Sequence, residues 1–190
     1  MAEVMEIRWH GRGGQGAKTA SLLLAQAAAM EGKYSQGFPD YGPERMGAPM
    51  RGFTRISDEP IKVHCAIYDP RIVIVLDDSL LKSVDVTDGT PQNGIIVVNT
   101  LKSPAEVRSV LGLEGRKIFT VDATGISIEE IGRPIPNAPM LGALIKVSGI
   151  LSLDVVLDQI RKKFSHGFRA EVLEGNLRAI HRAHEEVHGE

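Results

Sequence analysis

The sequence predicts an α/β domain with three layers, a Rossmann-like α/β/α arrangement in which helices cover a mostly parallel sheet. Two observations support this fold class. Strand-like and helical runs alternate between residues 5 and 122, an order typical of parallel sheets. Residues 72–76 and 95–98 are apolar at every position, as expected of strands that are covered on both faces. We also expect a helical C-terminus over the last 50 residues.

The expected elements follow one another along the chain. The first strand is predicted at residues 5–9, before an Ala/Leu-rich helix from about residue 15 to 30. Strands are also expected at residues 71–76, 95–99 and 117–122, with helices near 79–84 and 104–111. Residues 51–56 and 61–65 flank a Ser-Asp-Glu-Pro turn and predict a hairpin, which would make the sheet mixed. Towards the C-terminus, Pro139 lies near the start of one helix, Ser152 is the predicted N-cap of the next, and a final helix covers about 168–187.

Length and charge limit the class of protein. The 190 residues suit a single domain, residues 1–190, that can bury a core without disulfides. With 22 Lys and Arg against 24 Asp and Glu, the net charge is -2 and no basic block occurs, which argues against nucleic acid as a partner. No apolar run approaches the roughly 20 residues of a membrane span, and the N-terminus lacks a signal-peptide pattern. We therefore expect a cytoplasmic protein without membrane contact.

Metal chemistry finds little support in the sequence. The single cysteine, Cys65, excludes an internal disulfide and a self-contained iron–sulfur or cysteine-rich zinc site. It lies in an apolar stretch, residues 61–67, so we expect a buried strand residue rather than a reactive thiol. His184 and His188 match the H-E-x-x-H spacing of zinc helices. A solvated, frayed helix is the better interpretation, because no following segment supplies a third ligand.

The most informative motif joins the first strand to the first long helix. Gly11, Gly13 and Gly16 fit G-x-G-x-x-G in this position, which is the layout of a phosphate-binding turn. A side chain at Gly11 or Gly13 would block a tight turn, and one at Gly16 could hold the helix and the strand apart. The turn therefore predicts an anion site made of backbone N–H groups.

Other interpretations of this turn stay open. A dinucleotide site needs an acidic residue about 20 positions later, at the end of a second apolar strand, but residues 33–37 are short and polar, and Glu31 and Asp40 are poorly placed. A nucleoside-triphosphate loop is disfavoured because Ala17 precedes Lys18, which rotates the lysine by about 100°. A tight turn without a ligand is also possible on these residues. His10 ends the strand beside the turn, where a ligand-binding role and a packing role are equally consistent with the sequence.

Two irregular stretches complete the candidate surface. Residues 37–51 are too rich in Gly and Pro for a regular element, and loops of this length are uncommon in compact domains unless they bind something. Aromatic residues beside Arg45 and Arg51 suit a partner subunit or a phosphorylated ligand, although a self-packed loop would have the same composition. Residues 132–142 form a second turn-rich stretch, and the glycine-bearing helix there suits either core packing or a close interface.

Three segments together resemble a known family. Residues 7–18, residues 36–51 apart from Met46, and residues 137–143 resemble, in the same order, the gamma subunit or gamma domain of the 2-oxoacid:ferredoxin oxidoreductases. The resemblance is greatest to the pyruvate and 2-ketoisovalerate type, and it spans about three quarters of the chain.

The resemblance implies a subunit of an enzyme that oxidatively decarboxylates pyruvate with CoA to acetyl-CoA, CO₂ and reduced ferredoxin. Thiamine diphosphate, Mg and 4Fe-4S clusters are then expected on separate alpha, beta and delta subunits, with ferredoxin or flavodoxin as acceptor. This chain is expected to hold no cofactor and no catalytic residue, but to provide assembly contacts and, as a further hypothesis, to recognise CoA. The expected binding residues are Gly11, Arg12, Gly13, Gly14, Gln15, Gly16, Lys18, Tyr41 and Arg45.

Alternatives to this function stay open at the level of sequence. The chain could serve a 2-ketoisovalerate or 2-oxoglutarate oxidoreductase, since the substrate carbon lies against thiamine on other subunits. It could be a scaffold without ligand contact, or a stand-alone dinucleotide-binding protein.

Overall fold

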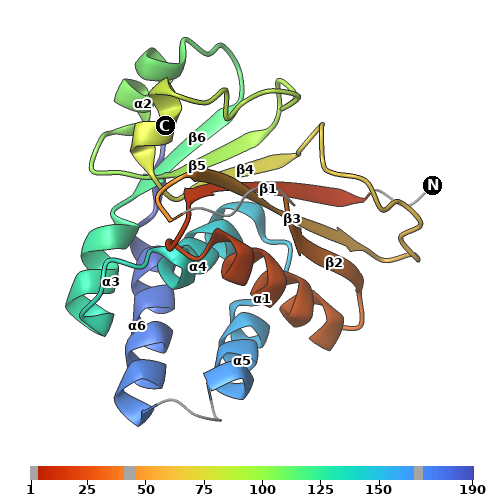
Figure 1. The fold of residues 1–190 in the computed structure, drawn as a ribbon, viewed down its shortest axis with the longest axis vertical. Helices are drawn as coiled ribbons and strands as arrows, with labels where there is room; N and C mark the ends of the chain where they lie inside the picture. Colours follow the sequence, from red (N-terminus) through yellow and green to blue (C-terminus); the bar gives the residue numbers. More distant parts are fainter. Residues whose placement is uncertain (1–3, 41–45, 165–168) are drawn as a thin grey trace.

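A single mixed sheet organises the chain in the computed structural model, which describes residues 4–40, 46–164 and 169–190 (Figure 1). Within that part of the chain the sheet has seven strands in the order β2-β3-β1-β4-β5-β6-β7. Their bounds are β1 Met5–Arg12, β2 Tyr34–Pro39, β3 Pro49–Ser57, β4 Ile72–Val75, β5 Ile95–Asn99, β6 Lys117–Val121 and β7 His188–Gly189. All run in one direction except β3 and β7, which pair antiparallel with their neighbours. The predicted, mostly parallel sheet is confirmed.

Helices cover the sheet on both faces, as the three-layer prediction requires. They are α1 Ala17–Met30, the 3₁₀ helix η1 Asp78–Lys82, α2 Pro104–Leu111, α3 Ala123–Ile131, α4 Asn137–Ser148, α5 Leu153–Phe164 and α6 Ala170–Glu186. The larger core lies between the sheet and α1, α3, α4, α5 and α6. A smaller core lies on the opposite face, under η1 and α2. Figure 1 shows α2 on that side of the sheet, across from α1, α4, α5 and α6. None of the helices within the described ranges is long and apolar enough to cross a membrane.

The hairpin that makes the sheet mixed is not the predicted one. β3 contains residues 51–56 as expected, but it pairs with β1 on one side and with β2 on the other. Both edges of β3 are therefore occupied, so residues 61–65 cannot form the predicted hairpin with it. They form no strand, and Cys65 is exposed, so the prediction of a buried strand cysteine was wrong.

The partner strand β2 has few apolar residues because α1 packs closely against it. Ser35 donates a hydrogen bond from Oγ to the Ala25 carbonyl at 2.6 Å. A Cβ at Gly37 would come within 2.8 Å of the Ser21 carbonyl oxygen. These positions need small side chains, so the short polar stretch at residues 33–37 nevertheless forms a strand. The prediction of an irregular 37–51 was thus wrong at its two ends.

The C-terminal helices were predicted correctly in kind, and small shifts occur at their ends. Ser152 accepts a hydrogen bond at Oγ from the Val155 N–H at 3.3 Å, which fits its predicted capping role. The final helix begins at Ala170 instead of 168, which itself lies outside the described residues. α3 was not anticipated, although Asp122 caps it by accepting from the Gly125 N–H at 2.8 Å.

Helix α4 packs on α6 through glycine. A Cβ at Gly142 would collide with the backbone carbonyl oxygen of Ile180, so only glycine lets these two helices approach this closely. Of the two interpretations of this helix, core packing is the one that the structure shows.

Candidate functional site

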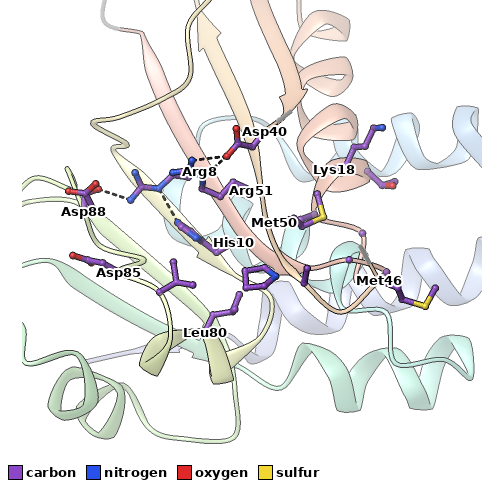
Figure 2. A pocket seen from close by; sticks show the side chains of 18 residues that line it. Arg8, His10, Lys18, Asp40, Met46, Met50, Arg51, Leu80, Asp85 and Asp88 are labelled. Atoms are coloured by element: carbon purple, nitrogen blue, oxygen red, sulfur yellow. Dashed lines mark hydrogen bonds and ion pairs between the residues drawn. The ribbon is translucent and has the colours of Figure 1, made fainter. Parts of the chain in front are cut away.

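A cleft of about 1070 Å³ opens at the carboxyl end of β1, where the chain turns into α1 (Figure 2). Ligands of open α/β sheets bind at this edge, and the cleft is as large as typical small-molecule sites of about 300–1000 Å³. Its polar and glycine residues are Arg8, His10, Gly13, Gly14, Gly16, Lys18, Thr19, Asp40, Arg51, Asp85 and Asp88. The glycine turn predicted from the sequence therefore lines one wall of this cleft.

The turn has the backbone geometry that the glycine motif predicts. Gly14 and Gly16 lie in the left-handed region, with φ of 100° and 83°, which favours glycine strongly. The Gly13 N–H donates to the Ala48 carbonyl at 3.0 Å, so this amide joins the turn to the start of β3. Gly16 precedes α1 without a side-chain cap. Since the first N–H groups of a helix lack intrahelical acceptors, this end of the cleft can accept an anionic group.

Two of the predicted binding residues hold the turn in place. Arg12 donates to Ser79 Oγ at 2.8 Å and to the Gly47 carbonyl at 3.1 Å, and it forms an ion pair with Asp77 at 3.3 Å. Gln15 accepts from the Arg12 N–H at 2.8 Å and donates to Asp77 Oδ2 at 2.7 Å. Neither residue is among those that line the cleft. Their side chains tie the turn to the segment after β4.

The outer glycines of the motif both lie in close packing. A Cβ at Gly11 would come within 3.3 Å of Ala17 Cβ, a tight contact between strand and helix. A Cβ at Gly16 would come within 2.5 Å of Asn137 Nδ2, at the start of α4. Gly16 therefore allows α1 to approach α4. The expected close contact at Gly16 was between the helix and the strand, and that expectation was wrong. The contact of Gly16 with Asn137 joins two of the three segments that carry the family resemblance.

Lys18, Tyr41 and Arg45 are the remaining predicted binding residues. Lys18 lies in the first turn of α1 and lines the cleft. Tyr41 and Arg45 lie outside the described residues. Met46, which follows them, is 93% exposed at the rim, and it bridges to Gly13.

Sequence reasoning missed Arg8, which the cleft shares with His10. Arg8 is only 2% exposed, and its guanidinium donates to the Val86 carbonyl at 3.1 Å and to the Asp88 carbonyl at 2.6 Å. Its Nε donates to His10 Nε2 at 3.0 Å. Both side chains leave β1 on the face opposite α1, because their strand partners Val73 and Val75 belong to the smaller core. The signal was two polar residues alternating with Ile7 and Trp9, a pattern typical of a strand with one polar face.

His10 is neutral in this environment. Burial, then the positive charges of Arg8 and Arg51, lower its pKa to about 3. Because Nε2 accepts from a guanidinium, the proton of the neutral ring is assigned to Nδ1. A packing role for His10 fits its burial, at 3% exposed, and its bond with Arg8; the ring also lines the cleft, which is compatible with the ligand-binding role.

Charged groups surround this end of the cleft (Figure 2). Arg51 pairs with Asp40, with Nη2 2.7 Å and Nε 2.8 Å from Oδ2. Its guanidinium also lies 5.8 Å from the centre of the Phe53 ring. Asp85 accepts from the Thr87 N–H and hydroxyl, and these bonds lower the pKa of its carboxyl.

The histidine motif at the C-terminus is not a zinc site. His184 lies in α6, but His188 lies in β7, with Nε2 3.2 Å from Thr120 Oγ1. The segment is ordered against β6 instead of frayed. In the described ranges no cluster of three or more His, Cys, Asp or Glu side chains could hold a metal ion.

Comparison with known proteins decides the family. The family model described as pyruvate ferredoxin/flavodoxin oxidoreductase matches residues 6–186. This chain belongs to that family. A pyruvate synthase subunit PorC of Thermotoga maritima is 52% identical over 182 residues, which are 96% of this chain and 94% of the relative. A pyruvate/ketoisovalerate oxidoreductases common subunit gamma of Pyrococcus furiosus is 47% identical over 184 residues, 97% of each chain.

Solved structures agree with the fold. The crystal structure of the pyruvate oxidoreductase subunit PorC of Thermotoga maritima superposes with a TM-score of 0.88 at 49% identity, over 98% of both chains. A 2-oxoglutarate:ferredoxin oxidoreductase of Magnetococcus marinus shares the fold alone, with a TM-score of 0.75 at 21% identity over 95% of this chain and 30% of that one. The predicted family is confirmed, as is the prediction of a subunit of a multi-subunit oxidoreductase.

Proposed function

We propose that this chain, residues 1–190 as one gamma domain, is the gamma subunit of a four-subunit pyruvate:ferredoxin oxidoreductase and that its cleft recognises CoA. The enzyme would decarboxylate pyruvate oxidatively and release acetyl-CoA, CO₂ and reduced ferredoxin or flavodoxin. Alpha, beta and delta subunits would carry thiamine diphosphate with Mg and the 4Fe-4S clusters, and the complex would be cytoplasmic. The pyruvate preference is supported by the names of the relatives, which are pyruvate synthase and pyruvate/ketoisovalerate oxidoreductase subunits.

The observation that carries the CoA proposal is the composition of the cleft wall. Gly13, Gly14, Gly16 and Lys18 belong to the most distinctive family segment, and all four line one cleft. CoA carries a diphosphate and a 3′-phosphate, and a helix N-terminus beside a lysine is a suitable acceptor for such groups. The proposal assigns the phosphates to this end, with Lys18 and the first amides of α1 as donors.

This chain's own contribution would be binding and orientation. The structure supports no acid–base role for His10, which stays neutral over the physiological range. When bound on its partner subunit, thiamine diphosphate would supply the carbanion chemistry of decarboxylation. Holding CoA in a fixed place lowers the cost of bringing its thiol to the reacting carbon.

Variant Lys18→Ala in the assembled enzyme tests the proposal. We expect the KM for CoA to rise about tenfold, the scale of one charge-assisted contact, while kcat and the KM for pyruvate stay near their wild-type values. The assay is CoA-dependent pyruvate oxidation with a viologen acceptor. Lys62→Ala, an exposed lysine outside the cleft wall, is the matched control.

An unchanged KM for CoA in a normally assembled Lys18→Ala enzyme would overturn the CoA part. The subunit part is tested separately, by co-purification of this chain from its native cell extract with mass spectrometry of its companions. Companions without thiamine or iron–sulfur centres would overturn it.

One observation favours a second substrate. A relative 47% identical to this chain is named a subunit common to pyruvate and ketoisovalerate oxidoreductases. If this chain is shared in the same way, its native extract will contain it in two complexes, one active on pyruvate and one on 2-ketoisovalerate. Finding it in one complex alone would exclude sharing.

A further inference from the structure

The end of the cleft beyond the glycine turn differs from the turn in charge. Figure 2 shows Arg8, His10 and Arg51 together, with Lys18 apart from them on the first turn of α1. Three carboxylates, of Asp40, Asp85 and Asp88, line the cleft with these residues, against two guanidinium groups. Among the described residues, this end therefore offers no excess of positive charge to a phosphate. A neutral oxygen acceptor suits it better.

His10 offers one defined donor to such an acceptor. Its Nε2 is occupied by Arg8, so the ring proton is on Nδ1. Among the described residues Nδ1 has no protein hydrogen-bond partner, and the one fully enclosed side-chain N or O atom there without a partner is Thr90 Oγ1. Nδ1 is therefore reached from the cleft that His10 lines.

Arg8 fixes the orientation of this donor. It is bound at once by the carbonyls of Val86 and Asp88, which belong to the segment after η1, and by the ring of His10 in its own strand. A guanidinium held by two backbone carbonyls cannot turn away, and it can only donate. The ring is thereby fixed in a single tautomer.

We propose that the Nδ1–H of His10 donates a hydrogen bond to an amide carbonyl oxygen in the pantetheine arm of CoA, and that Arg8 is the positioning residue for this donor. This inference rests on the proposed binding of CoA in the cleft. It assigns an orientation to the ligand, with the phosphates at the glycine turn and the pantetheine arm running towards Arg8 and His10. Because the donor is a neutral group, its contribution to binding does not vary between pH 6 and 8.

The test compares CoA with 3′-phosphoadenosine 5′-diphosphate, which keeps the phosphates and lacks the pantetheine arm. Both are measured on the assembled enzyme, CoA by its KM and the fragment by its inhibition constant against CoA. In His10→Leu we expect the KM for CoA to rise about three- to tenfold, the scale of one neutral hydrogen bond, while the inhibition constant of the fragment is unchanged. His10→Gln, which keeps an acceptor for Arg8 and an N–H donor, should restore much of the loss.

Each other outcome has a definite meaning. Equal weakening of CoA and the fragment in His10→Leu would overturn the orientation, because the ring would then act on the phosphate end. No change for either ligand, in an enzyme where Lys18→Ala does raise the KM for CoA, would overturn the role of His10 and leave the proposed function intact. If Lys18→Ala also has no effect, the proposed function itself fails.

Misfolding is controlled separately, by urea unfolding of each variant, so that equal weakening of both ligands in a normally folded and assembled enzyme is assigned to the phosphate end. His64→Leu, at an exposed histidine outside the cleft wall, is the matched substitution and should change neither constant. A long-range ¹H–¹⁵N spectrum of the full chain should show the His10 ring as the neutral Nδ1–H tautomer at pH 5. A protonated ring at that pH would overturn the assignment of the donor.

Discussion

The two halves of the sheet are built on different principles. β4, β5 and β6 form a parallel half. Most residues of these strands are apolar, and helices cover both faces (Figure 1). β1, β3 and β2 form a half in which β3 runs antiparallel to both neighbours. The charged side chains that are buried in the described part of the chain, Arg8 and Arg55, both belong to this second half.

The difference between the two halves explains where the cleft lies. Burying a guanidinium is costly unless every donor finds a partner, so such residues persist in a strand only with a dedicated set of acceptors. Arg55 has Glu6 at 2.7 Å and the Ala66 carbonyl at 3.3 Å, and Arg8 has backbone carbonyls and His10. The parallel half provides the packed frame, and the antiparallel half provides Arg8, His10 and Arg51 to the polar wall of the cleft.

Glycine substitutions in the two regions give the largest expected difference in the free energy of unfolding. Gly142→Ala in α4 should lower the free energy of unfolding by about 3 kcal/mol, because the new Cβ would collide with the Ile180 backbone in the packed frame. The matched change Gly52→Ala in β3 should cost about 1 kcal/mol, since its nearest backbone contact would be 3.1 Å away and Ser21 can turn aside. Urea unfolding of both variants measures the difference, and equal losses would contradict this view of the two halves.

The buried charge of the antiparallel half gives the next effect. Arg55→Met should lower the free energy of unfolding by about 2 kcal/mol, less than for a fully buried pair because Glu6 is 26% exposed and gains water. The exposed pair of Arg161 and Asp158 is the control, with side chains 53% and 58% exposed. Arg161→Met should change the same free energy by no more than about 0.5 kcal/mol. If the two variants unfold alike, the buried pair has no special role.

The pH dependence of stability isolates the cleft. The pKa of His10 is about 3 in the folded chain and about 6.5 when unfolded, so below pH 6.5 the unfolded chain binds the extra proton. Stability must therefore fall as the pH drops from 6.5 towards 3, by at most about 1.4 kcal/mol per pH unit from this one group. Above pH 6.5 the group contributes no slope.

Variant His10→Gln should remove that slope. Urea unfolding at pH 7, 6 and 5 will then show a smaller loss than in the wild type, while His64→Gln, at an exposed position, keeps the full loss. Identical curves for the wild type and His10→Gln would mean that the ring titrates normally. The other groups of lowered pKa, such as Asp77, are present in all three proteins and cancel in the comparison.

How much could be predicted from sequence follows the same division. The parallel strands were found because continuous apolar runs need helices on both faces, and β4, β5 and β6 lie close to the predicted residues. β2 was missed because α1 demands small side chains at Ser35 and Gly37, which makes a packed strand resemble a polar loop. The false strand at residues 61–65 had the right alternation, but pairing is a property of the sheet and β3 had no edge left.

The site was predictable to a similar extent. The glycine turn and Lys18 do line a cleft, because backbone conformation at Gly14 and Gly16 is a local property of the motif. Arg12 and Gln15 are held by Asp77, which is 62 residues or more away from both in the chain, so their structural role could not be seen locally. Arg8 was missed for the same reason, since its acceptors lie on a distant segment.

The edges of the two halves give the smallest and most local prediction. β6 is covered at its outer edge by β7, where Gly189 lies on the Phe119 ring and Glu190 pairs with Arg108. In Gly189→Val the new side chain would meet that ring, at 2.6 Å from Cβ alone, and should lift β7 away. Exposed strand edges open readily, so amide exchange should accelerate in β6 while global unfolding changes little, because β7 has only two residues. Exchange in β2, the strand at the opposite edge of the described sheet, should stay as in the wild type; faster exchange there as well would show that the two halves unfold together.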